Sequence, residues 1–297
     1  MLLTPDCIHC IFRASLNAIR SLTDDEAITK RLSRRILEIP ALRGLEWSVT
    51  SPQVIESAWR TITETFGEKD PYEQLKERQT LKAIELYPRL RTLIDESPRP
   101  VETAIKLAVV GNWIDLMWMQ GSDDIEFLVS ELEKPVAHSK SLERVADEIL
   151  SAERLVYLGD NAGEIVFDKL LIETILRFHE VKTYYVVRSR PTLNDATLRE
   201  ARMAGMQDIT LVLENGIDGP FPGTSIPRCS ERVQELLTEA DLVISKGGGN
   251  FDSLHEERRL LKKIAFLLVS KCNPYVSHFD VPLKQPIISL YSDGKQA

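Results

Sequence analysis

The stretch RLVYLGDNAGEIVFD, residues 154–168, decides the fold expected for this sequence. Its apolar run LVYL has the length of a short buried strand and stops at Gly159. A pattern of helical period resumes at Glu164, so the stretch is predicted to pass from a strand through a tight turn into a helix. The turn carries an acid and an amide, Asp160 and Asn161. A polar pair at a strand end calls for an explanation.

The same alternation of short apolar runs and amphipathic stretches continues toward the C-terminus. The strand candidates are 155–158, 183–188, 209–213, 241–245, 265–269 and 287–291, and the helix candidates between them are 163–178, 193–204, 230–240 and 253–263. Strands that alternate with helices predict a mostly parallel sheet with crossover helices on its faces. The fold class expected for this half is therefore α/β.

The first half of the chain has a different texture. From Cys10 to about Gly121, apolar residues recur every three or four positions, as in CIFRASLNAIRSL, VIESAWRTITETF and IKLAVVGNWIDLMW. That spacing is the helical period, and prolines interrupt it where one helix is expected to end or the next to begin. We therefore expect two domains: a mainly helical N-terminal domain at 1–140 and an α/β domain at 141–297 that carries the functional site.

Composition argues against several classes of partner. The 297 residues carry a formal net charge of −8 and no long basic tract, which argues against a nucleic-acid partner. The longest concentrated apolar run, 264–269, is too short to span a membrane, and the N-terminus MLLTPDCIHC lacks the basic start and apolar core of a signal peptide. A cytoplasmic location is expected, where the four cysteines would stay reduced.

Cys7 and Cys10 form a CxxC pair with His9 between them. These residues could be half of a zinc site, but no second pair follows at zinc-finger spacing, so completion would need a distant ligand. A redox role is weak, because the pair begins a helix-like segment and follows no strand. A packing role is the preferred interpretation.

Polar residues gather at the predicted strand ends. In an open parallel sheet the ligand binds at the carboxyl ends of the strands, which here read GDNAGE, RSRPTLND, SKGGGN and SKCN. Asp160, Asn161 and Asp195 offer the hard oxygen donors that Mg²⁺ or Mn²⁺ takes. Lys246 and Lys271 would supply positive charge opposite them. Together these groups are suited to phosphoryl transfer.

The glycine run Gly247, Gly248 and Gly249 would let backbone N–H groups approach phosphate oxygens without a Cβ in the way. It lacks the Walker spacing GxxxxGK[ST], and GDNAGE lacks the dinucleotide pattern GxGxxG. Asp160 and Asp195 also have a simpler interpretation as helix N-caps. Complementary groups at four strand ends favour a site, because capping does not require lysines.

Longer motifs resemble the metal-dependent damage-control phosphatases, formerly catalogued as domain of unknown function eighty-nine. GDNAGEIVFD resembles the signature segment of that family, RPTLND its second acidic motif, SKGGGNFDSL its glycine-rich motif and SKCN its late lysine motif. In the helical half, PDCIHCIFR, DPYEQLK and GNWIDL resemble it too, so the resemblance covers nearly the whole chain. The N-terminal CxxC is similar to that of the stand-alone, prokaryote-type branch.

This resemblance implies a Rossmann-like α/β part, built on a mostly parallel sheet with flanking helices, and a helical N-terminal part. It implies a divalent metal ion, Mn²⁺, Co²⁺, Ni²⁺ or Mg²⁺, held by Asp160, Asn161 and Asp195. It also implies hydrolysis of phosphate monoesters of small molecules, such as sugar phosphates or damaged phosphometabolites, with Lys271 holding the phosphate.

The same likeness implies further contacts with the substrate. Asn112 and Asp115 of GNWIDL would approach from the helical half, which places the pocket between the two parts of the chain. Lys246, Asn250 and the three glycines between them, as the matching glycine-rich motif, would also contact the substrate.

Two mechanisms and two other functions remain open. Either a metal-polarised water or Asp160 attacks phosphorus, and water is preferred because a carboxylate that binds the metal is already committed. Asp195 would be a metal ligand first and a base second. A nucleotide-dependent enzyme on a similar sheet is one alternative function, although the missing glycine patterns count against it. The other is a metal-dependent protein that binds a phosphometabolite and turns it over weakly or not at all.

Overall fold

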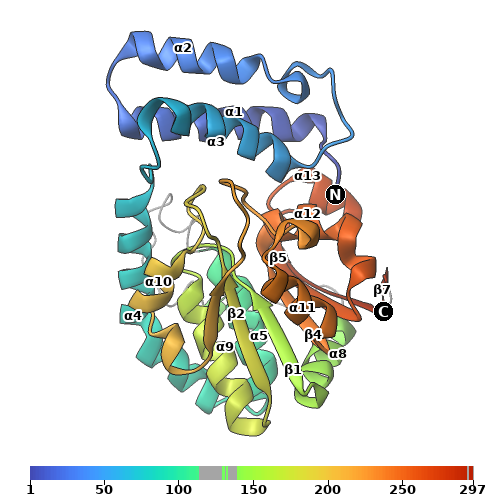
Figure 1. The fold of residues 1–297 in the computed structure, drawn as a ribbon. Coiled ribbons are helices and arrows are strands. Elements are labelled where there is room, and N and C mark those ends of the chain that lie inside the picture. Colours follow the sequence, from blue (N-terminus) through green and yellow to red (C-terminus); the bar gives the residue numbers. More distant parts are fainter. Residues whose placement is uncertain (114–128, 131, 133–138, 293, 297) are drawn as a thin grey trace.

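A computed structural model describes residues 1–113, 129–130, 132, 139–292 and 294–296 of the chain. It shows an α/β body built on one twisted sheet, with a layer of three helices lying across one end of that body (Figure 1). We call these three helices the cap; they are α1 (Pro5–Leu22), α2 (Glu26–Leu37) and α3 (Ser51–Phe66).

Across the described residues the sheet has seven strands in the order β3-β2-β1-β4-β5-β6-β7. The first five strands of the chain pair in parallel, whereas β6 and β7 are antiparallel to their neighbours. The strands are β1 (Arg154–Leu158), β2 (Lys182–Val187), β3 (Leu211–Glu214), β4 (Leu242–Lys246), β5 (Lys263–Val269), β6 (Pro286–Ser292) and β7 (Lys295–Gln296). The expected fold class, α/β with a mostly parallel sheet, is confirmed.

The strand order reverses between β1 and β4. From β1 the chain adds β2 and β3 on one side, and it then returns to add β4 and β5 on the other. The connections on the two sides leave the sheet edge in opposite directions at this point. Open α/β sheets bind their ligands there, outside the carboxyl ends of the central strands, and we call this place the crevice. Asp160 follows β1 and Gly247 follows β4, so both lie at this crevice.

Alternate residues of β1 face opposite sides of the sheet, as the pleat requires. Leu155 and Tyr157 enter the core on one face, and Val156 and Leu158 enter the core on the other. Buried side chains from helices complete each core. The first face is covered by α4 (Glu73–Asp95), α5 (Pro100–Val110), α8 (Ser139–Ser151), α9 (Ile165–Phe178) and α10 (Leu198–Met203), and the second by α11 (Glu231–Glu239), α12 (Gly247–Glu257) and α13 (Asn273–Phe279).

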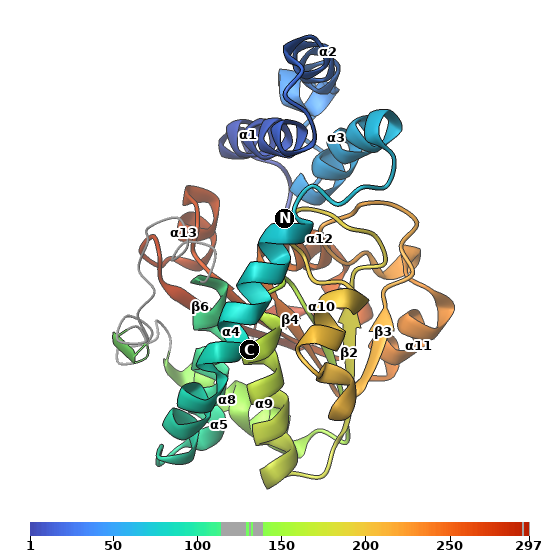
Figure 2. The same ribbon diagram turned by 90° about the vertical axis from the view of Figure 1, so that its left-hand side faces the viewer.

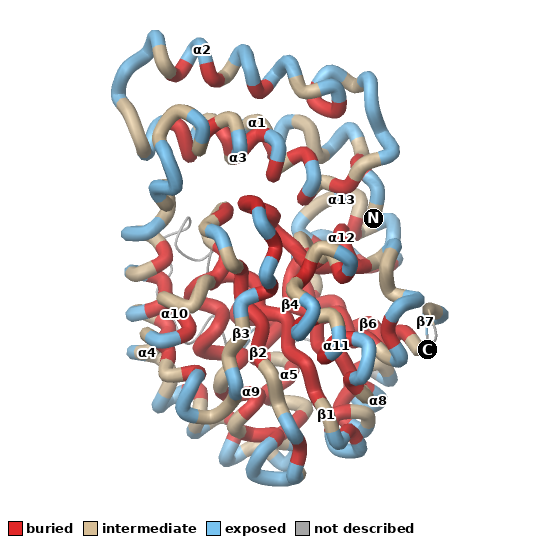
Figure 3. The backbone as a smooth tube through the Cα atoms, in the orientation of Figure 1, coloured by how far each residue is buried: buried red, intermediate tan, exposed pale blue. Residues whose placement is uncertain are grey.

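The cap has a small core of its own, which includes Ile19, Leu32 and Trp59. Its helices begin where the sequence supplies start signals: proline stands in the first turn of α1 and α3, and Asp25 accepts hydrogen bonds from two backbone amides at the start of α2. Figure 2 shows the cap set apart from the sheet in a second view, and Figure 3 shows mainly exposed backbone on the outer helix α2.

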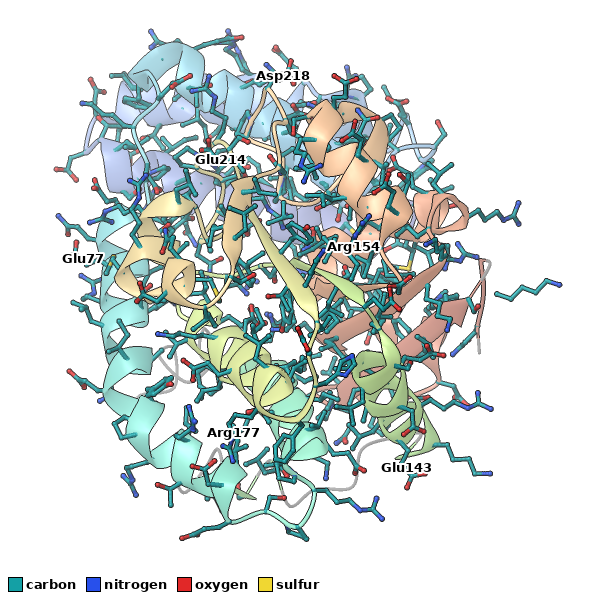
Figure 4. The ribbon with its side chains drawn as sticks, turned by 60° about the horizontal axis from the view of Figure 1, so that its bottom comes forward. Glu77, Glu143, Arg154, Arg177, Glu214 and Asp218 are labelled. Carbon is teal, nitrogen blue, oxygen red and sulfur yellow. The ribbon has the colours of Figure 1, made fainter. Side chains whose placement is uncertain are left out.

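Charged side chains join the cap to the body. Arg228, in the connection between β3 and α11, makes two hydrogen bonds of 2.8 Å to Glu56 of α3. It also contacts Asp218, which lies on the loop after β3 against the cap (Figure 4). Ser51 of α3 donates to Asp252 of α12 at 2.5 Å. These contacts hold the cap over the strand ends.

The helices α4 and α5 share one hydrophobic core with the sheet, although they precede residue 140. The domain boundary expected at that position stays a prediction; in packing, α1–α3 have a separate core. The helix expected at 253–263 begins earlier, at Gly247, because the glycine run forms its first turn rather than a loop. Within the described residues, no helix is long and apolar enough to cross a membrane.

Candidate metal and phosphate site

The loops after β1 and β2 are fastened to each other at the crevice. Asn161 and Asp195 pair across an isolated antiparallel bridge. Backbone hydrogen bonds flank it: the amide of Ala162 donates to Asn194 at 2.9 Å, and the amide of Ala196 donates to Asp160 at 2.7 Å. Two loops that are far apart in sequence therefore bring Asp160, Asn161 and Asp195 together, as the strand-end argument predicted.

Two of these side chains are carboxylates in a nearly dry environment. Asp160 is 7% exposed and Asp195 is 3% exposed. Burial, with the charge of Asp195 adding to it, raises the pKa of Asp160 well above its usual value. Burial raises the pKa of Asp195 too, although the neighbouring Arg188 opposes the shift. Two carboxylates held this close in a low dielectric favour binding of a cation.

One arginine contacts both carboxylates. Arg188 Nε donates to Asp195 Oδ2 at 2.6 Å, and Arg188 Nη2 lies 3.5 Å from Asp160 Oδ1. Its Nη1 donates to Asn250 Oδ1 at 3.0 Å. Among the described residues Nη2 has no hydrogen-bond partner, although it is buried. Arg188 is thus a buried cation shared by both carboxylates, and Lys271 and Lys76 add smaller attractions to Asp160 and Asp195 respectively.

The amide of Asn161 has a defined direction. Its Nδ2 donates to Asp160 Oδ2 at 3.1 Å and to Glu164 Oε2 at 2.9 Å. Because both partners are carboxylates, which accept hydrogen bonds when ionised, the NH₂ group is the end that points at them. The amide oxygen is then turned away from those two carboxylates, and its role as a ligand stays a prediction.

Asn112 reaches the same place from the turn that directly follows α5. It is 2% exposed, and its Nδ2 donates to Glu164 Oε2 at 2.8 Å and to Asp160 Oδ2 at 3.4 Å. The structure therefore brings Asn112 to the acidic cluster. Asp115 lies outside the described residues, so its predicted approach to the site stays a prediction.

The two lysines of the prediction have different surroundings. Lys246 is fully buried, and its amine donates to Glu164 and, at 3.0 Å, to Asp168. Lys271 is exposed, and its charge attracts Asp160 and Glu164. The positive charge of Lys246 is thus matched inside the protein, whereas that of Lys271 faces solvent. Substrate contact stays a prediction for both.

The glycine run packs tightly at the start of α12. Gly247 has φ +74°, and a Cβ built there would lie 1.8 Å from Asp160 Oδ2. A Cβ at Gly248 would meet the Tyr275 hydroxyl at 2.5 Å, and one at Gly249 would meet a backbone oxygen at 2.1 Å. Only glycine fits beside Asp160 without moving its carboxylate.

Asn250 links the two central strands. Its Nδ2 donates to the backbone oxygens of Gly159 at 3.0 Å and Lys246 at 2.8 Å, and its Oδ1 accepts from Arg188 and from Thr224. The side chain is fully buried. The structure therefore shows Asn250 bracing the crevice, and the predicted contact with substrate stays a prediction.

Four residues of this cluster were missed as candidates in the sequence: Glu164, Asp168, Arg188 and Lys76. Lys76 is 1% exposed, pairs with Asp70 at 2.6 Å and donates to the backbone oxygen of Asp195 at 3.4 Å. A signal was present for each. Glu164 and Asp168 lie inside GDNAGEIVFD, Lys76 ends DPYEQLK and Arg188 ends the strand candidate 183–188, and a charge at such a position needs a partner once it is buried.

The donor set fits a hard divalent cation. Asp160, Asn161 and Asp195 offer oxygen, which Mg²⁺ and Mn²⁺ prefer, and the set leaves room for water and a phosphate oxygen as further ligands. In the part of the chain that the structure describes, no group of three or more His, Cys, Asp or Glu side chains is arranged to hold a metal. The candidate set differs from such a group because one of its three members is an amide.

The fold and this cluster define the chain as an α/β protein with a helical cap and a candidate site at the strand-order reversal. The family model of the damage-control phosphatase ARMT1-like domain matches residues 3–287. The chain therefore belongs to the ARMT1-like damage-control phosphatase family. The resemblance found in the sequence motifs is confirmed, and with it the expectation of a phosphatase.

Relatives and a solved structure agree with this assignment. A damage-control phosphatase of Archaeoglobus fulgidus is 32% identical over 92% of this chain and 94% of its own length. An uncharacterized protein of Methanocaldococcus jannaschii is 30% identical over 96% of this chain and 94% of its own length. The crystal structure of a DUF89 family protein from Pyrococcus horikoshii matches with a TM-score of 0.80 and 25% identity, covering 97% of this chain and 98% of that one. Family membership favours a divalent metal and a small-molecule substrate.

Proposed function

We propose that this chain hydrolyses phosphate monoesters of small metabolites, using a divalent metal ion held by Asp160, Asn161 and Asp195. The observation that carries the proposal is the bridge between Asn161 and Asp195, because it fixes three oxygen-bearing side chains at the strand-order reversal of the sheet. Mn²⁺, Co²⁺, Ni²⁺ and Mg²⁺ are the candidate ions. The bound ion would supply Lewis-acid polarisation of the phosphate and a polarised water.

Residues of the chain itself would bind the phosphate and accept the proton of the attacking water. Lys271 is exposed and its charge acts on Asp160, which supports a role for its amine in binding the phosphate of an arriving ester. Asp195, held by Arg188, keeps a carboxylate fixed that can also take a proton from attacking water. Asp160 is already shared among Arg188, Asn112 and Asn161, which favours water over Asp160 as the nucleophile.

The substrate class follows from the family name and from the site. The Archaeoglobus fulgidus relative is named a damage-control phosphatase, and we extend that role to this chain as hydrolysis of sugar phosphates or damaged phosphometabolites. The long loop after β3 and the cap both lie over the strand ends (Figure 1), so the non-reacting part of the ester would meet residues from these two segments.

The test is release of phosphate from a generic aryl phosphate by protein that has been stripped of metal and then given each of the four ions. We expect one or more ions to restore turnover in the wild-type chain and none to restore it in Asp195→Ala. Asp147→Ala, which changes an exposed carboxylate of α8, is the matched control and should keep the activity. Metal binding without turnover of any ester would favour a binding protein instead.

A further inference from the structure

We propose that Glu164 is a positioning residue that sets the direction of two side-chain amides, Asn112 and Asn161, so that both amide oxygens face the crevice. This inference rests on the proposed function, because it concerns how an oxygen ligand is presented to the metal. Glu164 itself contacts neither substrate nor metal in this account. It acts through the two asparagines.

The contacts of one carboxylate oxygen carry the inference. Glu164 Oε2 accepts from Asn112 Nδ2 at 2.8 Å, from Asn161 Nδ2 at 2.9 Å and from the backbone amide of Asn161 at 3.3 Å. An ionised carboxylate has no hydrogen to donate, so it can stabilise the NH₂ end of an amide and not the oxygen end. A flipped asparagine would place two oxygens against each other at this buried position, which is unfavourable.

A buried network behind Glu164 keeps that carboxylate ionised and in place. Its other oxygen accepts from Lys246, whose amine also donates to Asp168 Oδ1 at 3.0 Å. Asp168 in turn accepts from the hydroxyls of Tyr157 and Tyr185, each at 2.7 Å. All five side chains are buried. This arrangement gives Lys246 a role that needs no contact with substrate.

Orientation of the amide matters because a metal binds the oxygen of asparagine and not its NH₂ group. Asn161 is one of three proposed ligands, so a population of flipped amides would lower metal affinity in proportion. Partners of metal ligands typically change affinity by about 10- to 100-fold when they are removed. Glu164 should therefore affect metal binding even though it is not a ligand.

The experiment uses calorimetric binding of Mn²⁺ to metal-stripped protein, with Glu164→Gln, Asn161→Asp and the double variant. Glutamine keeps the shape of Glu164 but can offer either end to its neighbours, so Glu164→Gln should weaken Mn²⁺ binding by about 10- to 100-fold. In the double variant, the glutamine NH₂ can donate to the new aspartate, and the total charge returns to that of the wild type. The double variant should recover most of the affinity that Glu164→Gln lost.

The matched control is Glu173→Gln on the same helix, α9. Glu173 pairs with Arg91 at 2.8 Å, away from the crevice, so this variant should bind Mn²⁺ as the wild type does. Thermal unfolding of each variant checks that it is folded. Wild-type affinity in Glu164→Gln would overturn the proposal, and so would a double variant that binds no better than Glu164→Gln.

A second measurement separates this inference from the proposed function. Side-chain NH₂ protons that are bonded to a buried carboxylate exchange slowly with solvent. In metal-free protein, the NH₂ signals of Asn112 and Asn161 should be protected, and Glu164→Gln should remove most of that protection. Slow exchange of these NH₂ protons in a protein that binds no metal would contradict the proposed function but support the positioning role. Rapid exchange in the wild type would contradict the positioning role and leave the proposed function unaffected.

Discussion

Asn161 and Asp195 face each other across an isolated antiparallel bridge, although their loops follow different strands of a parallel sheet. The backbone, and not side-chain packing alone, therefore fixes the separation of the two residues. Asp160 is tied to the same bridge through the amide of Ala196. A set of ligands mounted on hydrogen-bonded backbone keeps its geometry before any ion arrives, which lowers the cost of binding one.

Gly247→Ala should damage the site without unfolding the protein. The new Cβ would lie 1.8 Å from Asp160 Oδ2, so the carboxylate must move. A ligand displaced by about 1 Å can cost about 100-fold in rate. We expect a loss of that order in metal-dependent turnover. Gly67→Ala is the control, because Gly67 has a similar φ of +75° with no atom within 4 Å of the added Cβ. It should lower stability by about 1–3 kcal/mol and leave turnover intact. Equal losses of turnover in the two variants would contradict this prediction.

Arg188→Met should destabilise the metal-free protein strongly. It leaves Asp160 and Asp195 buried without their shared cation, and removing one partner of a buried pair costs about 3–5 kcal/mol. The control Arg190→Met breaks an exposed pair with Glu68 and should cost less than about 1 kcal/mol. Urea unfolding measures the loss of stability in each of the two variants. Saturating Mn²⁺ should recover part of the stability lost in Arg188→Met, and a similar cost for the two variants would argue against the role of Arg188.

Lys271→Met should impair catalysis more than metal binding. Loss of one cationic contact to the transferring phosphate lowers kcat/KM by about 100-fold. Mn²⁺ affinity should be no weaker, since removing a nearby positive charge does not disfavour a cation. The control Lys30→Met removes an exposed lysine from the outer helix α2 and should change kcat/KM by less than about twofold. Steady-state kinetics measures kcat/KM, and calorimetry measures Mn²⁺ affinity. An unchanged kcat/KM in Lys271→Met would show that this lysine takes no part in the mechanism.

His255 should make the protein less stable in acid. Burial lowers the pKa of His255 from 6.5 to about 4, and its ring packs against Phe251, His278 and Tyr291. As pH falls below 6.5 the unfolded chain takes up the proton first, so the free energy of unfolding falls until pH is near 4. One proton gives a slope of at most about 1.4 kcal/mol per pH unit, reduced by solvent screening.

His255→Gln should flatten that slope in urea unfolding between pH 7 and pH 4.5. The comparison is made between variant and wild type because carboxylates also titrate in this range. His278, which packs against His255 and whose pKa is lowered as well, keeps part of the slope. A slope identical in the two proteins would show that His255 has the same pKa in the folded and unfolded states, which would contradict this account.

The strands, and the meeting of three polar residues at one edge of the sheet, were predictable from the sequence. Each apolar run that was expected to be a strand forms one, because short apolar runs between polar turns have few other ways to be buried. Asp160, Asn161 and Asp195 were expected together because parallel strands present their carboxyl ends at one edge. That argument needs only the order of strands and loops, both of which are local properties of the sequence.

The surroundings of the site were not predictable in the same way. Lys246 was expected to face a phosphate, yet its side chain lies between Glu164 and Asp168, and which way a strand-end side chain points depends on the helix packed against it. The start of α12 at Gly247 was missed because glycine is a poor helix former, and tertiary packing overrides that preference here. Buried partners that are distant in the sequence cannot be inferred from the local spacing of apolar and polar residues.

Anomalous diffraction from a crystal of this protein soaked in Mn²⁺ tests the central claim most directly. We predict one strong peak within about 2.0–2.6 Å of oxygens from Asp160, Asn161 and Asp195 together. A peak at any other group of residues, or none at a concentration that supports turnover, would contradict the assignment of the metal site.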